Sequence, residues 1–111
     1  MPKIKDVKIA DEICKILNED HAVDIVILDV QNQTTITSHM IVCSGRSSRQ
    51  VAAIAAHVLE KMKAKGHAAI SISGLQSAEW VLLDFGEVIL HVMQPGIRAF
   101  YHLEGLWHKD L

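Results

Sequence analysis

The sequence is poor in aromatic residues and proline, and it has no excess of positive charge. Its 111 residues include two tryptophans, one tyrosine, two phenylalanines and two prolines. The formal net charge is −2, and acidic and basic residues are interspersed along the chain. A protein that binds nucleic acid through nonspecific electrostatics carries a strongly basic surface. We therefore expect a protein partner rather than a bare duplex.

Cysteines, metal-binding patterns and long apolar runs are also scarce. Cys14 and Cys43 lie in apolar patterns without metal-ligand spacing, which favours buried thiols in a reducing compartment. The seven histidines form no His-Glu-x-x-His or Cys-His pattern, so we expect no metal and no other cofactor. No apolar run approaches the roughly 18 residues that span a bilayer. Since residues 1–6 also have no apolar signal-peptide core, we expect a soluble, cytoplasmic protein that does not bind membranes.

Aliphatic residues are abundant, and they predict one compact domain. Hydrophobic residues make up 50% of the chain, which is enough for one core, and the length is too short for two. No repeat or low-complexity linker divides the sequence. We expect a single domain over residues 1–111.

The apolar periodicity predicts an α/β (α+β) fold with the order αββαβββα. Helical spacing indicates one helix from about Asp6 to Glu19, a second from Ser47 to just before Gly66, and a last helix that follows Pro95. Runs rich in β-branched residues indicate strands at 24–30, 39–44 and 69–73, followed by a long hairpin at 80–93. On the last helix, the spacing predicts a packed face that covers the sheet and stabilises the fold, formed by Tyr101, Glu104 and Trp107.

The hairpin from Trp80 to Met93 is apolar on both faces. A two-residue turn at Phe85 and Gly86 would place three pairs opposite each other: Asp84 and Glu87, Leu82 and Ile89, and Trp80 and His91. The other face is then purely aliphatic and is predicted to be core, formed by Val81, Leu83, Val88, Leu90 and Val92.

The tryptophan-bearing face of the hairpin is the candidate binding surface. Two like charges opposite each other destabilise a sheet unless a cation pairs with them. Asp84 and Glu87 therefore favour a basic partner. From the pattern alone, a Trp80 covered by one of the protein's own helices is an equally good interpretation. For the two acids, the ordinary alternative is a solvated turn.

The turn before the second helix is a candidate anion site. It offers two guanidinium groups and two hydroxyls at a helix N-terminus, from Arg46, Ser47, Ser48 and Arg49. A peripheral rRNA contact would use these groups. Alternatively, a small nucleotidyl- or phosphoryl-transfer enzyme would use the whole turn from Ser44 to Arg49 as a phosphate cradle. We prefer a simpler interpretation, in which Ser47 and Gln50 form a capping box and the arginines are exposed. The following strand lacks the paired carboxylates that would hold catalytic magnesium, so we do not expect an enzyme.

Four blocks of the sequence, in order and at the right spacing, carry a family resemblance. They are Leu28-Asp29-Val30, residues 40–51, residues 77–93, and Arg98 with residues 101–107. Together they resemble the ribosomal silencing factor family, also called Iojap-like. The resemblance implies a mixed five-stranded sheet with helices, similar to nucleotidyltransferases but without their activity.

The resemblance also implies a function. Such a protein binds the large ribosomal subunit through its fourteenth protein, sterically blocks joining of the small subunit, and represses translation under nutrient limitation. Ser38 stands where the family often has an acid, so the role of this position stays open. The implied contacts are Trp80, Leu82, Asp84, Glu87 and Ile89, with His91 and Met93 at the far edge. A homodimer through the same patch, when the protein is off the ribosome, is a further alternative.

Overall fold

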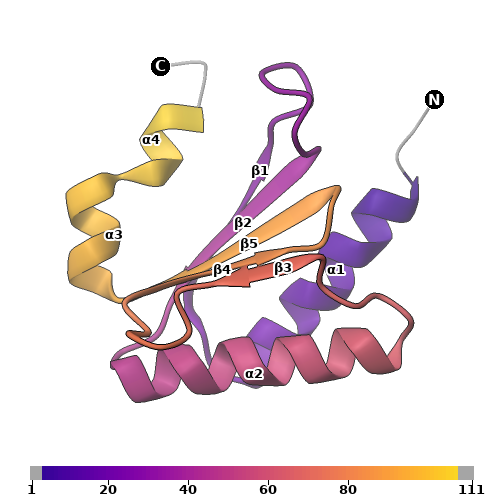
Figure 1. Ribbon diagram of the computed structural model, residues 1–111. Coiled ribbons are helices and arrows are strands. Elements are labelled where there is room, and N and C mark those ends of the chain that lie inside the picture. Colours follow the sequence, from indigo (N-terminus) through magenta and orange to yellow (C-terminus); the bar gives the residue numbers. More distant parts are fainter. Residues whose placement is uncertain (1–3, 108–111) are drawn as a thin grey trace.

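Residues 4–107 are described by the computed structural model, which contains one sheet and helices on both of its faces (Figure 1). The elements, in chain order, are α1 (Ile4–Glu19), β1 (Val23–Asp29), β2 (His39–Ser44), α2 (Ser48–Ala64), β3 (Ser71–Ser73), β4 (Trp80–Asp84), β5 (Val88–Met93), α3 (Pro95–Tyr101) and α4 (Leu103–Trp107). The predicted order is confirmed, except that the last helix is divided in two. Within the described residues, no helix has the length and apolarity to cross a membrane.

The last helix is divided at His102. This residue has a φ of 47°, in the left-handed region, and its N–H donates to the Arg98 carbonyl. A left-handed residue ends an α-helix, because the next N–H groups can no longer reach the preceding turn. Left-handed backbone favours glycine, but position 102 is a histidine. The sequence pattern therefore did not predict the break.

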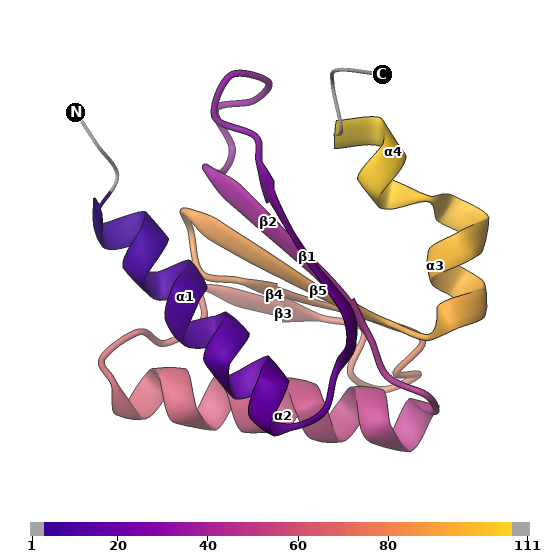
Figure 2. The same cartoon turned by 180° about the vertical axis from the view of Figure 1, so that it is seen from behind.

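The sheet has five strands in the order β1-β2-β5-β4-β3. Strands β2 and β5 are parallel, and all the other neighbours are antiparallel, so the sheet is mixed as the resemblance implied. Helices α1 and α2 pack against one face, and Figure 2, which shows the molecule from behind, has α1 in front of the sheet. Helices α3 and α4 lie on the opposite face, near the end where β5 leaves the sheet (Figure 1).

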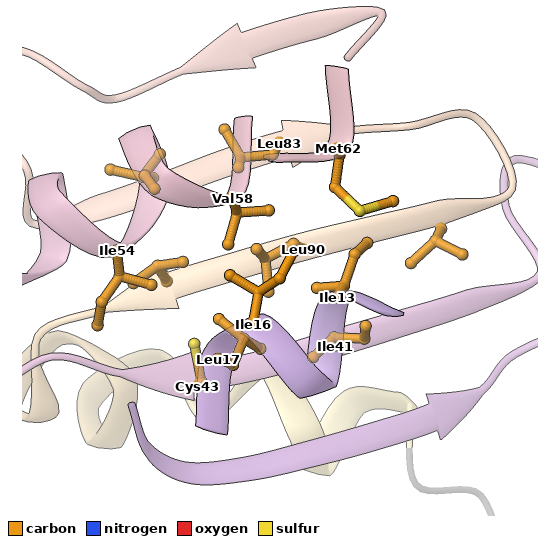
Figure 3. Packing of buried hydrophobic residues seen from close by; sticks show 14 of the residues in the cluster. Ile13, Ile16, Leu17, Ile41, Cys43, Ile54, Val58, Met62, Leu83 and Leu90 are labelled. Atoms are coloured by element: carbon orange, nitrogen blue, oxygen red, sulfur yellow. The ribbon is translucent and has the colours of Figure 1, made fainter. Parts of the chain in front are cut away.

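The main hydrophobic core lies between the sheet and helices α1 and α2 (Figure 3). The aliphatic face predicted for the hairpin is confirmed as part of it, since all five side chains have 0% exposure: Val81, Leu83, Val88, Leu90 and Val92. Cys43 is buried and Cys14 is partly buried, and both are free thiols. Burial raises the pKa of the Cys43 thiol to about 12, so it stays protonated and unreactive.

The hairpin register differs from the prediction by a shift of the turn. Phe85 N–H donates to the Val88 carbonyl at 2.9 Å, so the turn is centred on Gly86 and Glu87. Gly86 has a φ of 89°, a conformation that glycine adopts without strain. The predicted pairs are therefore wrong, and the observed partners are Asp84 with Ile89, Leu82 with His91, and Trp80 with Met93.

Candidate partner-binding surface

The candidate surface is the face of β4 and β5 that points away from α1 and α2. We call it the docking face, and it consists of Trp80, Leu82, Asp84, Ile89, His91 and Met93, with Glu87 at the turn. Moving the turn by one residue shifted each cross-strand partner by two positions, so the predicted side chains still share one face.

The residues of the docking face differ in exposure. Trp80, Leu82 and Asp84 on β4 are partly exposed, and Glu87 is exposed. The three residues on β5 are buried, with exposed fractions of 7% for Ile89, 4% for His91 and 0% for Met93. The accessible part of the face therefore follows β4 and the turn, and the side chains of β5 on the same face are buried beside it.

Trp80 is held on two sides by other aromatic rings. Its indole Nε1–H donates to Nδ1 of His91 at 3.0 Å. The Tyr101 ring on α3 lies on the indole, with a centroid separation of 5.1 Å. Trp80 also packs against a second apolar cluster on this face, formed by Leu28, Val30, Met40, Val42 and Met93. The indole is thus anchored in the fold and still partly exposed.

The aromatic surface continues from Trp80 onto α3. Tyr101 is 53% exposed, and the Phe100 ring meets it edge-on at 5.0 Å. Phe100 itself is 80% exposed. The sequence prediction treated Tyr101 as a packing residue, and the structure gives it both a packed side and an exposed side. The side chain of Trp107, predicted to pack with it, lies outside the described residues.

His91 is a neutral imidazole at physiological pH. Burial lowers the pKa of His91 to about 4. Because Nδ1 accepts the indole N–H, the ring proton resides on Nε2. That Nε2 atom is buried and has no hydrogen-bond partner among the described residues.

The two acids at the rim do not face each other. Asp84 Oδ1 accepts the Gly86 N–H at 2.7 Å, which fixes the start of the turn. The Glu87 carbonyl accepts the N–H groups of Ser38 and His39, each at 3.1 Å, and so ties the turn to the start of β2. The predicted pairing of Asp84 directly opposite Glu87 is therefore wrong, and each acid holds a different part of the turn.

Sequence reasoning missed the role of Arg98. Its guanidinium donates through Nε to Glu104 Oε2 at 2.8 Å and through Nη1 to Ser44 Oγ at 2.9 Å. The Arg98 side chain is only 11% exposed. This network joins α3, α4 and the end of β2, and thereby fixes the helix that carries Tyr101. The sequence feature that could have indicated this role is a single arginine in an otherwise apolar helix.

The turn before α2 is a capped helix start, as preferred. Ser47 Oγ accepts the Gln50 N–H at 3.1 Å, and Gln50 Oε1 accepts the N–H of Arg46. The four residues of the candidate anion site are all exposed: Arg46, Ser47, Ser48 and Arg49. A contact with an rRNA phosphate stays a prediction. In the described part of the chain, no group of three or more His, Cys, Asp or Glu side chains is arranged to hold a metal ion.

Several known proteins that this chain resembles in sequence have names that refer to the ribosome. Residues 3–111 match the profile of a family described as "Ribosomal silencing factor during starvation". The chain is 41% identical to the ribosomal silencing factor of Zymomonas mobilis over 91 residues, which cover 82% of this chain and 68% of that one. A mouse protein named mitochondrial assembly of ribosomal large subunit protein 1 is 32% identical over 101 residues, which cover 87% of this chain and 44% of that one.

The fold has a match among solved structures. A crystal structure of a protein from Chromobacterium violaceum superposes with a TM-score of 0.89 at 38% sequence identity. The superposition covers 94% of this chain and 87% of that one.

Proposed function

Since the chain belongs to the ribosomal silencing factor family, we propose that it represses translation by occupying the large ribosomal subunit and blocking the small subunit from joining. The proposed contact is the fourteenth protein of the large subunit, and the proposed setting is the cytoplasm under nutrient limitation. The name of the mouse relative also refers to the large subunit, which supports this choice of partner. Such a factor acts by steric occupancy and needs no catalytic group.

The observation that carries the proposal is the apolar and acidic character of the accessible docking face. Exposed aromatic rings continue from Trp80 to Tyr101 and Phe100, and the carboxylates of Asp84 and Glu87 lie toward the turn. Protein interfaces combine such aromatic anchors with a polar rim. Ribosomal proteins are rich in lysine and arginine because they bind RNA, and their cations complement these two acids.

Each residue of the docking face has a proposed role. Trp80 and Leu82 supply the apolar contact, and Asp84 and Glu87 pair with basic side chains of the partner. The three buried residues of β5 support the β4 side chains from the adjacent strand, namely Ile89, His91 and Met93.

Co-sedimentation with purified large subunits tests the proposal. Trp80→Ala and Glu87→Lys should each abolish binding, while the circular dichroism spectrum stays unchanged. Asp84→Lys should do the same, although it also removes the acceptor that fixes the Gly86 N–H.

The matched control is Glu60→Lys. It makes the same change in net charge at an exposed position on α2, on the opposite side of the sheet. This variant should bind like the wild type and should still prevent 70S formation when small subunits are added. Retained co-sedimentation of Trp80→Ala and Glu87→Lys would show that the surface is assigned to the wrong face.

A further inference from the structure

The side chain of His91 is too deeply buried to touch a partner in this conformation. It is 4% exposed, although it shares the docking face with accessible residues. It lies opposite Leu82 on the adjacent strand, and its Nδ1 accepts the indole N–H of Trp80 at 3.0 Å. The specific interaction through which His91 can influence binding is therefore its hydrogen bond to the indole.

We propose that His91 is a positioning residue, which holds the Trp80 indole in the orientation that the large subunit binds. This inference rests on the proposed function. The hydrogen bond from Nε1 to Nδ1 fixes the edge of the indole, and the Tyr101 ring limits its movement from the other side. A side chain that is ordered before binding loses less conformational entropy when the partner arrives.

The unused nitrogen of His91 supports this interpretation. Nε2 is buried without a hydrogen-bond partner among the described residues, which is unfavourable for a polar group. A leucine of similar size would fill the same place in the sheet without this penalty. Histidine contributes one thing here that leucine does not, which is the Nδ1 acceptor for the indole.

Two substitutions separate the acceptor from the packing. His91→Asn keeps an acceptor, because the asparagine Oδ1 lies close to the position of Nδ1. His91→Leu keeps the volume and removes the acceptor. The first readout is the indole N–H signal of Trp80 in a ¹⁵N-edited NMR spectrum of the free protein, assigned by its loss in Trp80→Phe. The second is the Kd for purified large subunits.

In His91→Leu, the indole signal should move to the position of an indole without a protein acceptor, and binding should weaken by about threefold to tenfold, the range expected for one lost hydrogen bond. In His91→Asn, the indole signal should stay near its original position and the Kd should remain within about twofold. The stability of His91→Leu should equal or exceed that of the wild type, so weaker binding could not be explained by unfolding.

Leu90→Val is the control for general damage to β5. It trims the neighbouring side chain on the opposite face, within the main core, and should lower stability without moving the indole signal. Wild-type affinity in His91→Leu would overturn the proposal, as would equal weakening in His91→Asn and His91→Leu. If the wild type itself fails to bind large subunits, the proposed function fails, while the indole signal still reports whether His91 orders Trp80.

Discussion

Among individual residues, His91 has the clearest link between burial and pH. Its pKa is lowered by burial from 6.5 to about 4, so the unfolded chain takes up a proton at a higher pH than the folded protein does. Stability linked to this group is fully present above pH 6.5 and is lost as the pH falls toward 4. The full loss is about 3 kcal/mol, from about 1.4 kcal/mol per unit of pKa.

Urea unfolding at pH 7 and pH 4.5 measures this loss. The wild type should lose more stability between these two values than His91→Leu, which cannot be protonated at this position. The difference isolates His91 from the carboxylates that also titrate in this range. Equal losses in both proteins would show that His91 is not kept neutral by the fold.

Gly74 is a second residue where local geometry sets stability. Its φ is 86°, and a Cβ built on it would lie 2.0 Å from the carbonyl oxygen of Trp80. Gly74→Ala should therefore displace the start of β4 and lower the free energy of unfolding by about 3 kcal/mol or more.

Gly96→Ala is the matched control for Gly74. Gly96 lies in α3 with no atom within 4 Å of the added carbon, and its φ is not positive. Alanine at this helical position should stabilise the protein by about 0.5–1 kcal/mol. Thermal unfolding of the two variants should thus shift in opposite directions, and parallel shifts would contradict the geometric argument.

At the scale of elements, the α3–α4 segment depends on the Arg98 network. Arg98→Ala removes a guanidinium that holds Glu104 and Ser44, and leaves a carboxylate in a largely closed place. The loss should be about 3 kcal/mol, as for other buried ion pairs that lose one partner. Amide hydrogen exchange should accelerate in α3 and α4 more than in α2.

An exposed ion pair provides the comparison for Arg98. Lys61 and Glu19 join α2 to α1 at 3.5 Å, with side-chain exposures of 44% and 49%. Lys61→Ala should cost less than about 1 kcal/mol, because water screens this pair. Similar losses of unfolding free energy in Arg98→Ala and Lys61→Ala would show that the Arg98 network stabilises the protein no more than an exposed ion pair does.

The hairpin shows how far sequence reasoning reaches at this scale. The two faces of β4 and β5 were predicted correctly, because side chains alternate with a period of two whatever the turn does. The register was wrong, because Asp84 accepts the Gly86 N–H and moves the turn centre to Gly86 and Glu87. A pattern of apolar residues contains no information about that side-chain bond.

The candidate site was predictable in part for a similar reason. Trp80, Leu82, Asp84 and Glu87 are at least partly exposed, and their role as contacts stays a prediction. The burial of β5 and the continuation onto α3 depend on where the last helices pack. The Arg98 network helps to set that position, and its partners lie 6, 54 and 75 residues away in the sequence.

At the scale of the whole molecule, charge should control the strength of docking. The chain has a net charge of −2, and the acids of the docking face are proposed to meet basic side chains. Binding to large subunits should weaken as the salt concentration rises, because counterions screen the exposed pairs. Glu87→Gln should reduce this salt dependence, and Glu60→Gln on α2 should leave it unchanged.

The position of β5 in the middle of the sheet affects how the protein is made. Strand β2 is synthesised early, yet its parallel neighbour β5 follows more than 40 residues later. Until β5 emerges from the exit tunnel, β1 and β2 form an isolated hairpin, which has little stability in water. The nascent chain therefore cannot complete its sheet, or display the docking face, while most of it is still being translated.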